Sequence, residues 1–341
     1  MQYRELGASG IQASVVAFGA WAIGGWFWGG AEEGDAINAI HAALDNGMNL
    51  LDTAPVYGMG HSEKVVAKAI KGRRDKVVLA TKCGLIWDGS NEGKGQFHFA
   101  ADESTKRDDG HIKVYRYLTA ASLRHEVEQI LTRLGTDHVD LLQTHWQDPT
   151  TPIAETMSCL MDLKREGKIR AIGCSNASTE HMDAYRTAGQ LDVDQEQYSM
   201  LDRQHEATNL PYCKQHSVSF LAYSPLSQGL LTGKIGPKRT FGPGDQRNTK
   251  PRFSQENRQR IAAMLAEFAP LTEKYQCDLG QLVIGWTIAQ PGCTHALVGA
   301  RTAEQTLANM KGGDVVMSAE DSTFMRETLL KYDFTVETPR K

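Results

Sequence analysis

Four side chains that could move a proton stand at or just after the ends of short apolar segments. Apolar runs end at Asp52, Lys82 and His145, and Tyr57 follows soon after Asp52. If these runs are strands of a parallel α/β barrel, their carboxyl ends converge on one face, so residues distant in the chain can share one pocket. The sequence therefore predicts a single site built from Asp52, Tyr57, Lys82 and His145.

The expected chemistry of this site is proton transfer to a carbonyl oxygen. An unperturbed tyrosine has a pKa of about 10 and is a poor acid at neutral pH. We expect the ammonium group of Lys82 to lower the pKa of Tyr57, while Asp52 keeps that ammonium charged. Tyr57 would then exchange a proton near neutral pH as a carbonyl carbon receives a hydride, and His145 would orient the carbonyl oxygen.

Each of these residues also has a simpler structural explanation. A buried Asp–Lys pair is often structural, because ion-pair networks perturb charged groups without any catalytic role. A histidine beside Trp146 is more often part of a core than catalytic. The joint placement at three strand ends is what favours a functional site.

Apolar runs and helical patterns alternate eight times along the chain, which is typical of a parallel α/β sheet. Eight units predict a closed (β/α)8 TIM barrel. Residues up to Ile11 are expected to form a hairpin that plugs the bottom of the barrel. The expected strands cover 15–18, 49–52, 77–82, 139–145, 168–173, 191–196, 218–223 and 296–298, and the expected helices cover 34–46, 62–70, 119–134, 153–166, 179–188, 205–216, 256–275 and 303–310.

The composition suits a single domain over residues 1–341, because 41% of the residues are hydrophobic and 23% are charged. The net charge of −4 offers no basic surface to nucleic acid or to an anionic membrane. No apolar run approaches the ~20 residues needed to cross a bilayer. The six cysteines lack metal-ligand spacing, so no metal is expected. These features predict a cytoplasmic protein, but charge alone identifies no partner, and nothing in the sequence determines the oligomeric state.

Two connections, 83–118 after the third strand and 226–257 after the seventh, are too long to be simple turns. Connections of this length in a compact domain are usually functional or disordered. We expect both to lie over the active-site face, the first as a wall beside the substrate and the second as a clasp over a cofactor. Surface insertions without a role are the alternative.

No side chain supplies a hydride, so hydride transfer needs a bound cofactor. No Gly-x-Gly-x-x-Gly follows a strand, which excludes the Rossmann type of dinucleotide site. The later strand ends instead carry amide, hydroxyl and aromatic groups that suit a carboxamide and a flat ring, with a helix N-terminus that suits phosphate. A nicotinamide across the barrel mouth is therefore predicted near Ser175, Asn176, Gln197, Tyr223 and the segment 299–301, with ordinary loop polarity as the alternative.

Several segments together resemble motifs of the aldo-keto reductase superfamily, and the resemblance covers nearly the whole chain. The matching segments are 51–58 (LDTAPVYG), 80–82 (ATK), 167–176 (GKIRAIGCSN) and 227–234 (SQGLLTGK). The catalytic tetrad of the family falls on the four residues identified above, Asp52, Tyr57, Lys82 and His145. The resemblance implies that Tyr57 donates the proton and that NADP(H) supplies the hydride.

The resemblance also implies how the cofactor is held. Tyr223 would stack on the nicotinamide, and the pyrophosphate would follow the segment 224–230. Arg301 is the expected partner of a 2′-phosphate, because a guanidinium matches phosphate geometry, although Val298 stands where relatives often carry proline. The residues expected to contact the cofactor are Gly19, Trp21, Asp52, Ser175, Asn176, Gln197, Tyr223, Ser224, Pro225, Leu226, Gln228, Gly229, Leu230, Lys234, Arg247, Gly299, Arg301, Gln305 and Asn309.

Tryptophans surround the place where a carbonyl would meet the tetrad, and the segment 21–30 resembles the bacterial branch close to inositol-operon and Gluconobacter glyceraldehyde reductases. Tryptophan rings stack on the C–H faces of sugars and also line apolar sites, and core packing is the alternative for each ring. The absence of an Arg/Lys cluster argues against a phosphorylated substrate, unless His111, Lys113 and Arg116 supply one. The expected pocket residues are Trp21, Trp26, Trp28, Tyr57, Trp87, His145 and Trp146.

The expected function is reversible, NADPH-dependent reduction of an aldehyde to an alcohol, the aldehyde being a small hydroxyaldehyde or a sugar-like carbonyl. Two other functions stay open. Lys82 could form the Schiff base of an aldolase or isomerase, or the chain could be a non-catalytic regulator that binds NADPH, as potassium-channel β-subunits of this fold do. Trapping of substrate on Lys82 would favour the first, and tight cofactor binding without turnover would favour the second.

Overall fold

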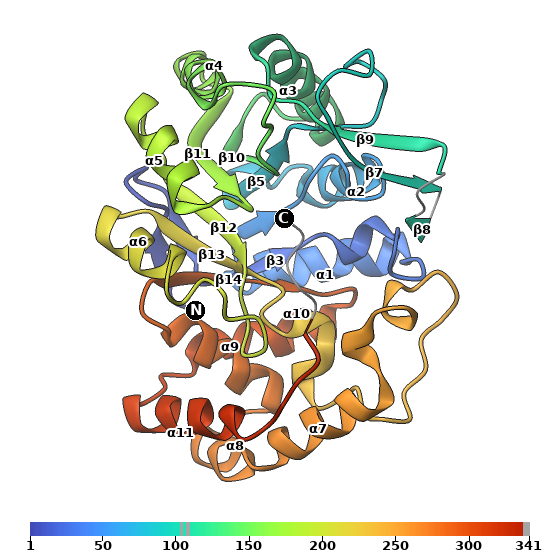
Figure 1. The fold of residues 1–341 in the computed structure, drawn as a ribbon, viewed down its shortest axis with the longest axis vertical. Helices are drawn as coiled ribbons and strands as arrows, with labels where there is room; N and C mark the ends of the chain where they lie inside the picture. The colour runs from blue at the N-terminus through green and yellow to red at the C-terminus, as the bar shows by residue number, and fades with distance from the viewer. Residues whose placement is uncertain (103–104, 107–109, 337–341) are drawn as a thin grey trace.

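The computed structural model describes residues 1–102, 105–106 and 110–336. Eight parallel strands close into a barrel in the order β10-β11-β12-β13-β14-β3-β4-β5, which confirms the predicted (β/α)8 class (Figure 1). The barrel strands are β3 (Val16–Gly19), β4 (Leu50–Asp52), β5 (Val78–Cys83), β10 (Val139–Thr144), β11 (Ile169–Ser175), β12 (Val193–Gln197), β13 (Ser219–Tyr223) and β14 (Cys293–Gly299).

The barrel strands are buried on both faces, and every residue of β5 and β10 is buried. Strands covered on both faces form nearly continuous apolar runs, which is why the sequence reveals them. The parallel register brings the tetrad residues of three neighbouring strands together: Asp52 pairs with Ala80, two residues before Lys82, and Lys82 pairs with Gln143, two residues before His145. The polar residues at these ends therefore lie at the same end of the barrel.

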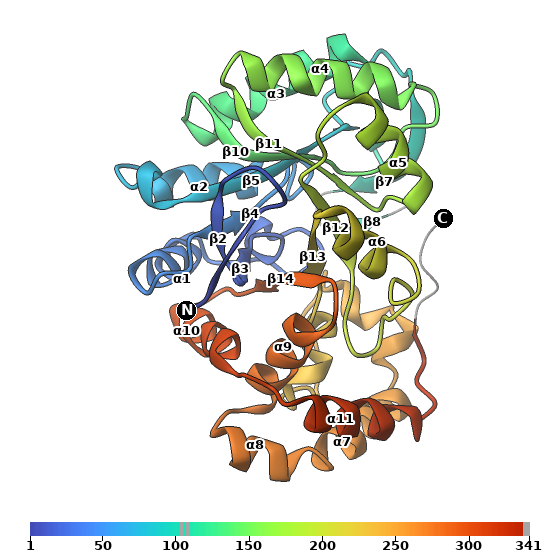
Figure 2. The same cartoon turned by 90° about the vertical axis from the view of Figure 1, so that its left-hand side faces the viewer.

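The hairpin of β1 (Tyr3–Glu5) and β2 (Gln12–Ser14) closes the opposite end of the barrel. Leu6 and Ile11 belong to the same buried cluster as Leu50 and Leu141 of the barrel strands. In Figure 2 the hairpin lies to the left of the barrel strands, whereas β7 (Gln96–Asp102) and β8 (Thr105–Lys106) lie to the right. The predicted plug is therefore present, and the cavity described below opens at the other end.

The helices match the predicted ones except late in the chain. Pro270 lies in the first turn of α8 and lacks the N–H that a continuous helix needs, so the predicted helix 256–275 is divided in two. A further helix, α9, is buried on nearly every side and lacks an amphipathic pattern. The helices are α1 (Glu33–Asp45), α2 (His61–Ile70), α3 (Ala120–Leu134), α4 (Ile153–Arg165), α5 (Thr179–Ala188), α6 (Asn209–His216), α7 (Gln255–Ala266), α8 (Ala269–Tyr275), α9 (Leu279–Ala289), α10 (Ala303–Met310) and α11 (Ala319–Leu330), of which α9 and α11 were not predicted.

The first long connection, 83–118, folds as a small antiparallel sheet rather than a loop, although residues 103–104 and 107–109 lie outside the described ranges. The second, 226–257, contains the short 3-10 turns η3 (Ser227–Thr232), η4 (Gln246–Asn248) and η5 (Pro251–Phe253). Within the described ranges, no helix is long and apolar enough to cross a membrane. The antiparallel sheet of the first connection has the strand order β6 (Leu85–Ile86), β9 (Ile112–Arg116), β7 (Gln96–Asp102) and β8 (Thr105–Lys106).

Candidate active site

A cavity of about 1380 Å³ opens among the carboxyl ends of the barrel strands. Residues of both long connections contribute to its wall. Small-molecule pockets usually measure roughly 300–1,000 Å³. The cavity is therefore large enough for a dinucleotide together with a small substrate.

The four predicted catalytic residues meet at this cavity. Asp52, Tyr57 and His145 line it, and Lys82 lies behind them and is buried. Lys82 Nζ donates to Asp52 Oδ2 at 2.6 Å, to the carbonyl oxygen of Thr53 at 3.0 Å and to Tyr57 Oη at 3.3 Å. The rings of Tyr57 and His145 stand nearly perpendicular with centroids 5.8 Å apart. The phenol is thus in contact with the cation on one side and beside the imidazole on the other.

The electrostatics of Tyr57 differ from the expectation. Burial, and after it the Asp52 carboxylate, raise the pKa of the Tyr57 hydroxyl well above its ordinary value. Burial also lowers the pKa of Lys82, against the opposing effect of Asp52. The predicted fall of the Tyr57 pKa is therefore wrong, because burial and the Asp52 carboxylate both disfavour the phenolate. Tyr57 is a protonated phenol at neutral pH, which is the state that a proton donor needs.

Two glutamines inside the barrel hold Asp52, and neither was predicted from the sequence. Gln143 Nε2 and Gln195 Nε2 donate to Asp52 Oδ1 at 3.2 and 2.9 Å, so the other carboxylate oxygen is left to Lys82. Space for Gln143 depends on Gly173, because a Cβ at Gly173 would lie 2.7 Å from Gln143 Cγ. Gln195 stands two residues before Gln197 and so shares its strand face. This spacing is the sequence pattern that could have identified Gln195 as a site residue.

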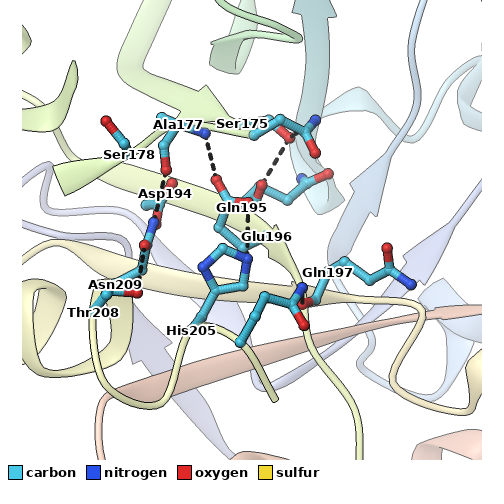
Figure 3. A network of polar contacts seen from close by, with 12 residues as sticks. Ser175, Ala177, Ser178, Asp194, Gln195, Glu196, Gln197, His205, Thr208 and Asn209 are labelled. Carbon is cyan, nitrogen blue, oxygen red and sulfur yellow. Dashed lines mark hydrogen bonds and ion pairs between the residues drawn. The ribbon is translucent and has the colours of Figure 1, made fainter. Parts of the chain in front are cut away.

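A second polar network lies on the outer side of β12 and fixes the loop after β11 (Figure 3). Glu196 Oε1 accepts from the backbone N–H of Ala177 at 2.6 Å, and Glu196 Oε2 lies 3.4 Å from Nε2 of His205. Asn209 Nδ2 donates to the carbonyl oxygen of Ala177 and to Asp194 Oδ2, each at 2.9 Å. Both backbone groups of Ala177 are therefore held by buried side chains.

Asp194 and Glu196 are neighbouring buried carboxyl groups. Burial raises the pKa of Asp194 to about 6 and that of Glu196 well above its ordinary value, and the nearby Asp194 charge raises the Glu196 pKa further. Glu196 is accordingly the protonated partner at neutral pH, because two adjacent buried carboxylates repel each other.

The loop held by this network presents Asn176 to the cavity in a left-handed backbone conformation, with φ of 55°. Asn176 Nδ2 donates to the carbonyl oxygen of His145 and to Ser175 Oγ, and Asn176 Oδ1 accepts from the hydroxyl of Tyr223 at 2.9 Å. Non-glycine residues in this conformation cluster at functional sites. Both hydrogens of Nδ2 are thus donated within the protein, and Oδ1 keeps one lone pair that suits the amide hydrogens of a nicotinamide carboxamide beside the Tyr223 ring.

The predicted pyrophosphate segment has an unusual backbone. Ser224, Ser227, Gln228 and Gly229 all have positive φ, at 57°, 45°, 57° and 98°. These residues, apart from Ser227, line the cavity, whereas Leu230 is buried away from it. The predicted cofactor residues that line the cavity are Gly19, Trp21, Asp52, Ser175, Asn176, Gln197, Tyr223, Ser224, Pro225, Leu226, Gln228, Gly229, Lys234, Arg247, Gly299, Arg301, Gln305 and Asn309.

The loops after β3 and β13 touch across the cavity. Trp28 and Asp245 form an isolated antiparallel bridge, and the guanidinium of Arg247 lies over the Trp28 ring at 5.3 Å. Arg247 also pairs with Asp245 at 2.6 Å, and Arg301 Nη1 donates to the carbonyl oxygen of Trp28 at 3.4 Å. The connection 226–257, predicted as a clasp over the cofactor, therefore contacts Trp28, a residue predicted for the substrate pocket.

The predicted tryptophans divide into two groups. Trp21, Trp28 and Trp146 line the cavity. Trp26 and Trp87 are absent from its described lining. Trp87 packs instead on the apolar cluster of Ala54, Val56, Leu85 and Val114 behind the site. The structure thus supports three of the five tryptophans as pocket residues and places Trp26 and Trp87 elsewhere.

Comparison with known proteins agrees with this geometry. Residues 15–329 match the model of the aldo/keto reductase family, so the chain belongs to that family and the resemblance seen in the sequence is confirmed. An NADH-specific methylglyoxal reductase of Escherichia coli (strain K12) is 40% identical over 96% of this chain and 98% of the relative. An aldo-keto reductase of Bacillus subtilis (strain 168) is 39% identical over 94% of this chain and 91% of the relative.

Among solved structures, a glycerol dehydrogenase from Gluconobacter oxydans is similar over 99% of this chain and 98% of its own. The TM-score is 0.84 and the sequence identity is 36%. Carbonyl reduction and a nicotinamide cofactor are consistent with membership of the aldo/keto reductase family.

The outer network generates a prediction about Glu196. Glu196→Ala should weaken binding of a nicotinamide nucleotide about tenfold, because the Ala177 N–H loses its acceptor and the Asn176 loop is released. Glu196→Gln should bind nearly as the native protein does, because an amide can accept from Ala177 and donate to Asp194. Tryptophan-fluorescence titration with NADPH measures both, and equal dissociation constants for the two variants would contradict the positioning role.

Proposed function

We propose that the protein reduces a small aldehyde reversibly to the alcohol, with hydride from a nicotinamide cofactor, preferably NADPH, and with Tyr57 as the proton donor. The observation that carries the proposal is the meeting of the Tyr57 hydroxyl, the His145 ring and the Asn176–Tyr223 pair in one cavity, with the Lys82–Asp52 pair directly behind the phenol. Family membership supports carbonyl reduction as the reaction class.

The residues present fit a nicotinamide dinucleotide. The Tyr223 hydroxyl is occupied by Asn176, so its ring is fixed beside the amide that would bind a carboxamide. Arg301 and Lys234 line the part of the cavity proposed for the adenosine end and bring positive charge. When bound, the reduced nicotinamide supplies the hydride.

The tetrad would handle the proton in this reaction. Tyr57 Oη donates its proton to the carbonyl oxygen, and Lys82 Nζ at 3.3 Å stabilises the negative charge left on the phenol. Asp52, fixed by Gln143 and Gln195, keeps the ammonium directed at that oxygen. The imidazole of His145, at right angles to the phenol, would orient the carbonyl oxygen for the transfer.

Two relatives bear names that describe small oxygenated substrates: one is called a methylglyoxal reductase and the other a glycerol dehydrogenase. Trp21, Trp28 and Trp146 line the cavity, and the Trp21 ring lies beside that of Tyr57 with centroids 6.2 Å apart, so the site has an aromatic surface that suits a short carbon chain. We infer a substrate of that size class. Arg116 is absent from the described lining of the cavity, so the phosphorylated substrate considered above has no support.

The alternative functions have less support. A Schiff base needs a neutral, accessible amine, whereas Lys82 is buried, makes three hydrogen bonds and is not among the described lining residues. Turnover of a carbonyl substrate would distinguish an enzyme from a regulator that only binds the nucleotide.

Replacement of Tyr57 tests the proton donor. Tyr57→Phe should lower kcat at least about a hundredfold, which is the usual contribution of a general acid, while the dissociation constant for NADPH stays nearly unchanged. Steady-state reduction of glyceraldehyde, followed at the nicotinamide absorbance, measures the first quantity. Tyr212→Phe on α6, outside the cavity, is the matched control, and a fully active Tyr57→Phe would contradict the proposal.

The raised pKa of Tyr57 predicts opposite pH profiles in the two directions. Tyr57 keeps its proton at every pH well below the raised pKa. Ionisation of Tyr57 should therefore not lower kcat for reduction between about pH 6 and 9. Oxidation of the alcohol needs the phenolate as base, so its rate should rise over the same range. A reduction profile that falls around neutral pH would show that Lys82 lowers the pKa of Tyr57 after all.

Nucleotide preference tests the role of Arg301. A charge-assisted contact to a 2′-phosphate contributes roughly 1.5–3 kcal/mol, so Arg301→Ala should weaken NADPH binding roughly tenfold to a hundredfold and NADH binding far less. Titration of the native protein and of Arg301→Ala with NADPH and with NADH measures the dissociation constants. Tighter binding of NADH by the native protein, as the name of the Escherichia coli relative describes for that enzyme, would contradict the NADPH preference.

A further inference from the structure

The turn 224–229, expected to run along the pyrophosphate, has a backbone that needs support from outside the turn. Ser224, Ser227 and Gln228 all have positive φ although none of them is glycine. Such a conformation is unfavourable for a residue with a Cβ and persists only where the surrounding structure enforces it. Gln228 lines the cavity, whereas Ser227 is fully buried and is absent from the described lining. The side chain of Ser227 is therefore placed to hold the turn from behind.

A buried carboxylate accepts the hydroxyl of Ser227. Asp202, which follows β12 in the chain, is 5% exposed. Its Oδ2 accepts from Ser199 Oγ at 2.9 Å and from Ser227 Oγ at 3.3 Å, and the two serine oxygens lie 2.9 Å apart. Ser199 Oγ also accepts from the backbone N–H of Asp202 at 3.1 Å. The turn is thereby attached to the segment that leaves the barrel strand β12.

The same carboxylate holds the far end of the connection 226–257. Arg252 in η5 is 1% exposed, and its Nη2 donates to Asp202 Oδ1 at 2.5 Å. The carbonyl oxygen of Arg252 accepts from Asn257 Nδ2 at 2.7 Å, which ties it to α7. Asp202 therefore binds the connection twice, through Ser227 near its beginning and through Arg252 near its end. The cavity-lining residues between them depend on this double attachment.

We propose that Asp202 is a positioning residue for the cofactor, because it fixes the turn 224–229 in the conformation that receives the pyrophosphate. The inference rests on the proposed binding of a nicotinamide dinucleotide. Asp202 is itself absent from the described lining of the cavity, so it acts through Ser227 and Arg252 rather than by contact with the nucleotide.

The charge beside the turn suits a pyrophosphate. Arg247 lines the cavity, and its Nη1 donates to the carbonyl oxygen of Gln228 at 3.4 Å. Guanidinium groups match the geometry of phosphate oxygens. The pyrophosphate is common to NADPH and NADH, whereas the 2′-phosphate assigned to Arg301 is present in NADPH alone. A role of Asp202 at the pyrophosphate therefore affects both nucleotides equally.

Removal of the Ser227 hydroxyl tests this role. Ser227→Ala should raise the dissociation constants for NADPH and for NADH by the same factor, about tenfold, because the turn loses its hydrogen bond to a charged group. Tryptophan-fluorescence titration of the whole chain with each nucleotide measures both constants. Ser227→Gly removes the same hydroxyl and tolerates positive φ, so it gives the same comparison if the alanine variant does not fold.

Ser14→Ala is the matched control. Ser14 is also fully buried, and its hydroxyl donates to the carbonyl oxygen of Val16 at 2.8 Å, at the plugged end of the barrel. Its replacement should lower Tm by an amount similar to that for Ser227→Ala and leave both dissociation constants unchanged. An equal loss of affinity in Ser14→Ala would show that the effect is merely structural and would overturn the inference.

The outcomes separate this inference from the proposed function. At saturating NADPH, kcat for glyceraldehyde should change far less in the Ser227 variants than KM for NADPH does, because the tetrad is untouched. Native-like affinity for both nucleotides in these variants, or a loss for NADPH alone, would overturn the role of Asp202 and leave the reductase intact. A native protein that binds neither nucleotide would overturn the proposed function and the inference with it.

Discussion

The buried ion pair between Lys82 and Asp52 is the interaction on which the site depends. Removing two charges from water is costly, and deleting one partner of such a pair typically costs about 3–5 kcal/mol. The barrel meets this cost by surrounding the pair with polar groups: the Thr53 carbonyl accepts from Lys82, while Gln143 and Gln195 donate to Asp52. The cation is thereby held at the phenol of Tyr57.

The strand β12 serves two networks because its side chains alternate between the faces of the barrel wall. Gln195 points inward and holds the ion pair, whereas Asp194 and Glu196 point outward and hold the loop that carries Asn176. One strand therefore connects the proton-handling residues to the residues proposed for the carboxamide. A shift of β12 would disturb both parts of the site, and the parallel register with β11 and β13 opposes such a shift.

The sequence was sufficient for the barrel and for the meeting of Asp52, Tyr57, Lys82 and His145 at one end of it, because covered parallel strands leave apolar runs and these residues stand at or just after their ends. It was insufficient where the position or the pKa of a side chain depends on burial or on contacts between distant segments. Gln195 lies within a strand rather than at its end, and Trp87 turns to an apolar cluster that only the folded sheet creates. The sign of the Tyr57 pKa shift follows from desolvation, which no local pattern reveals.

Transfer of deuterium from nicotinamide to product tests the central claim most directly. The protein would be incubated with an aldehyde and NADPH, or NADH, deuterated at C4 of the nicotinamide on either face, and the alcohol would be examined by NMR. Direct hydride delivery in this cavity predicts one deuterium on the carbinol carbon from one labelled face and none from the other, with no exchange into water. An alcohol that carries no deuterium from either labelled face, or no alcohol despite bound nucleotide, would contradict it.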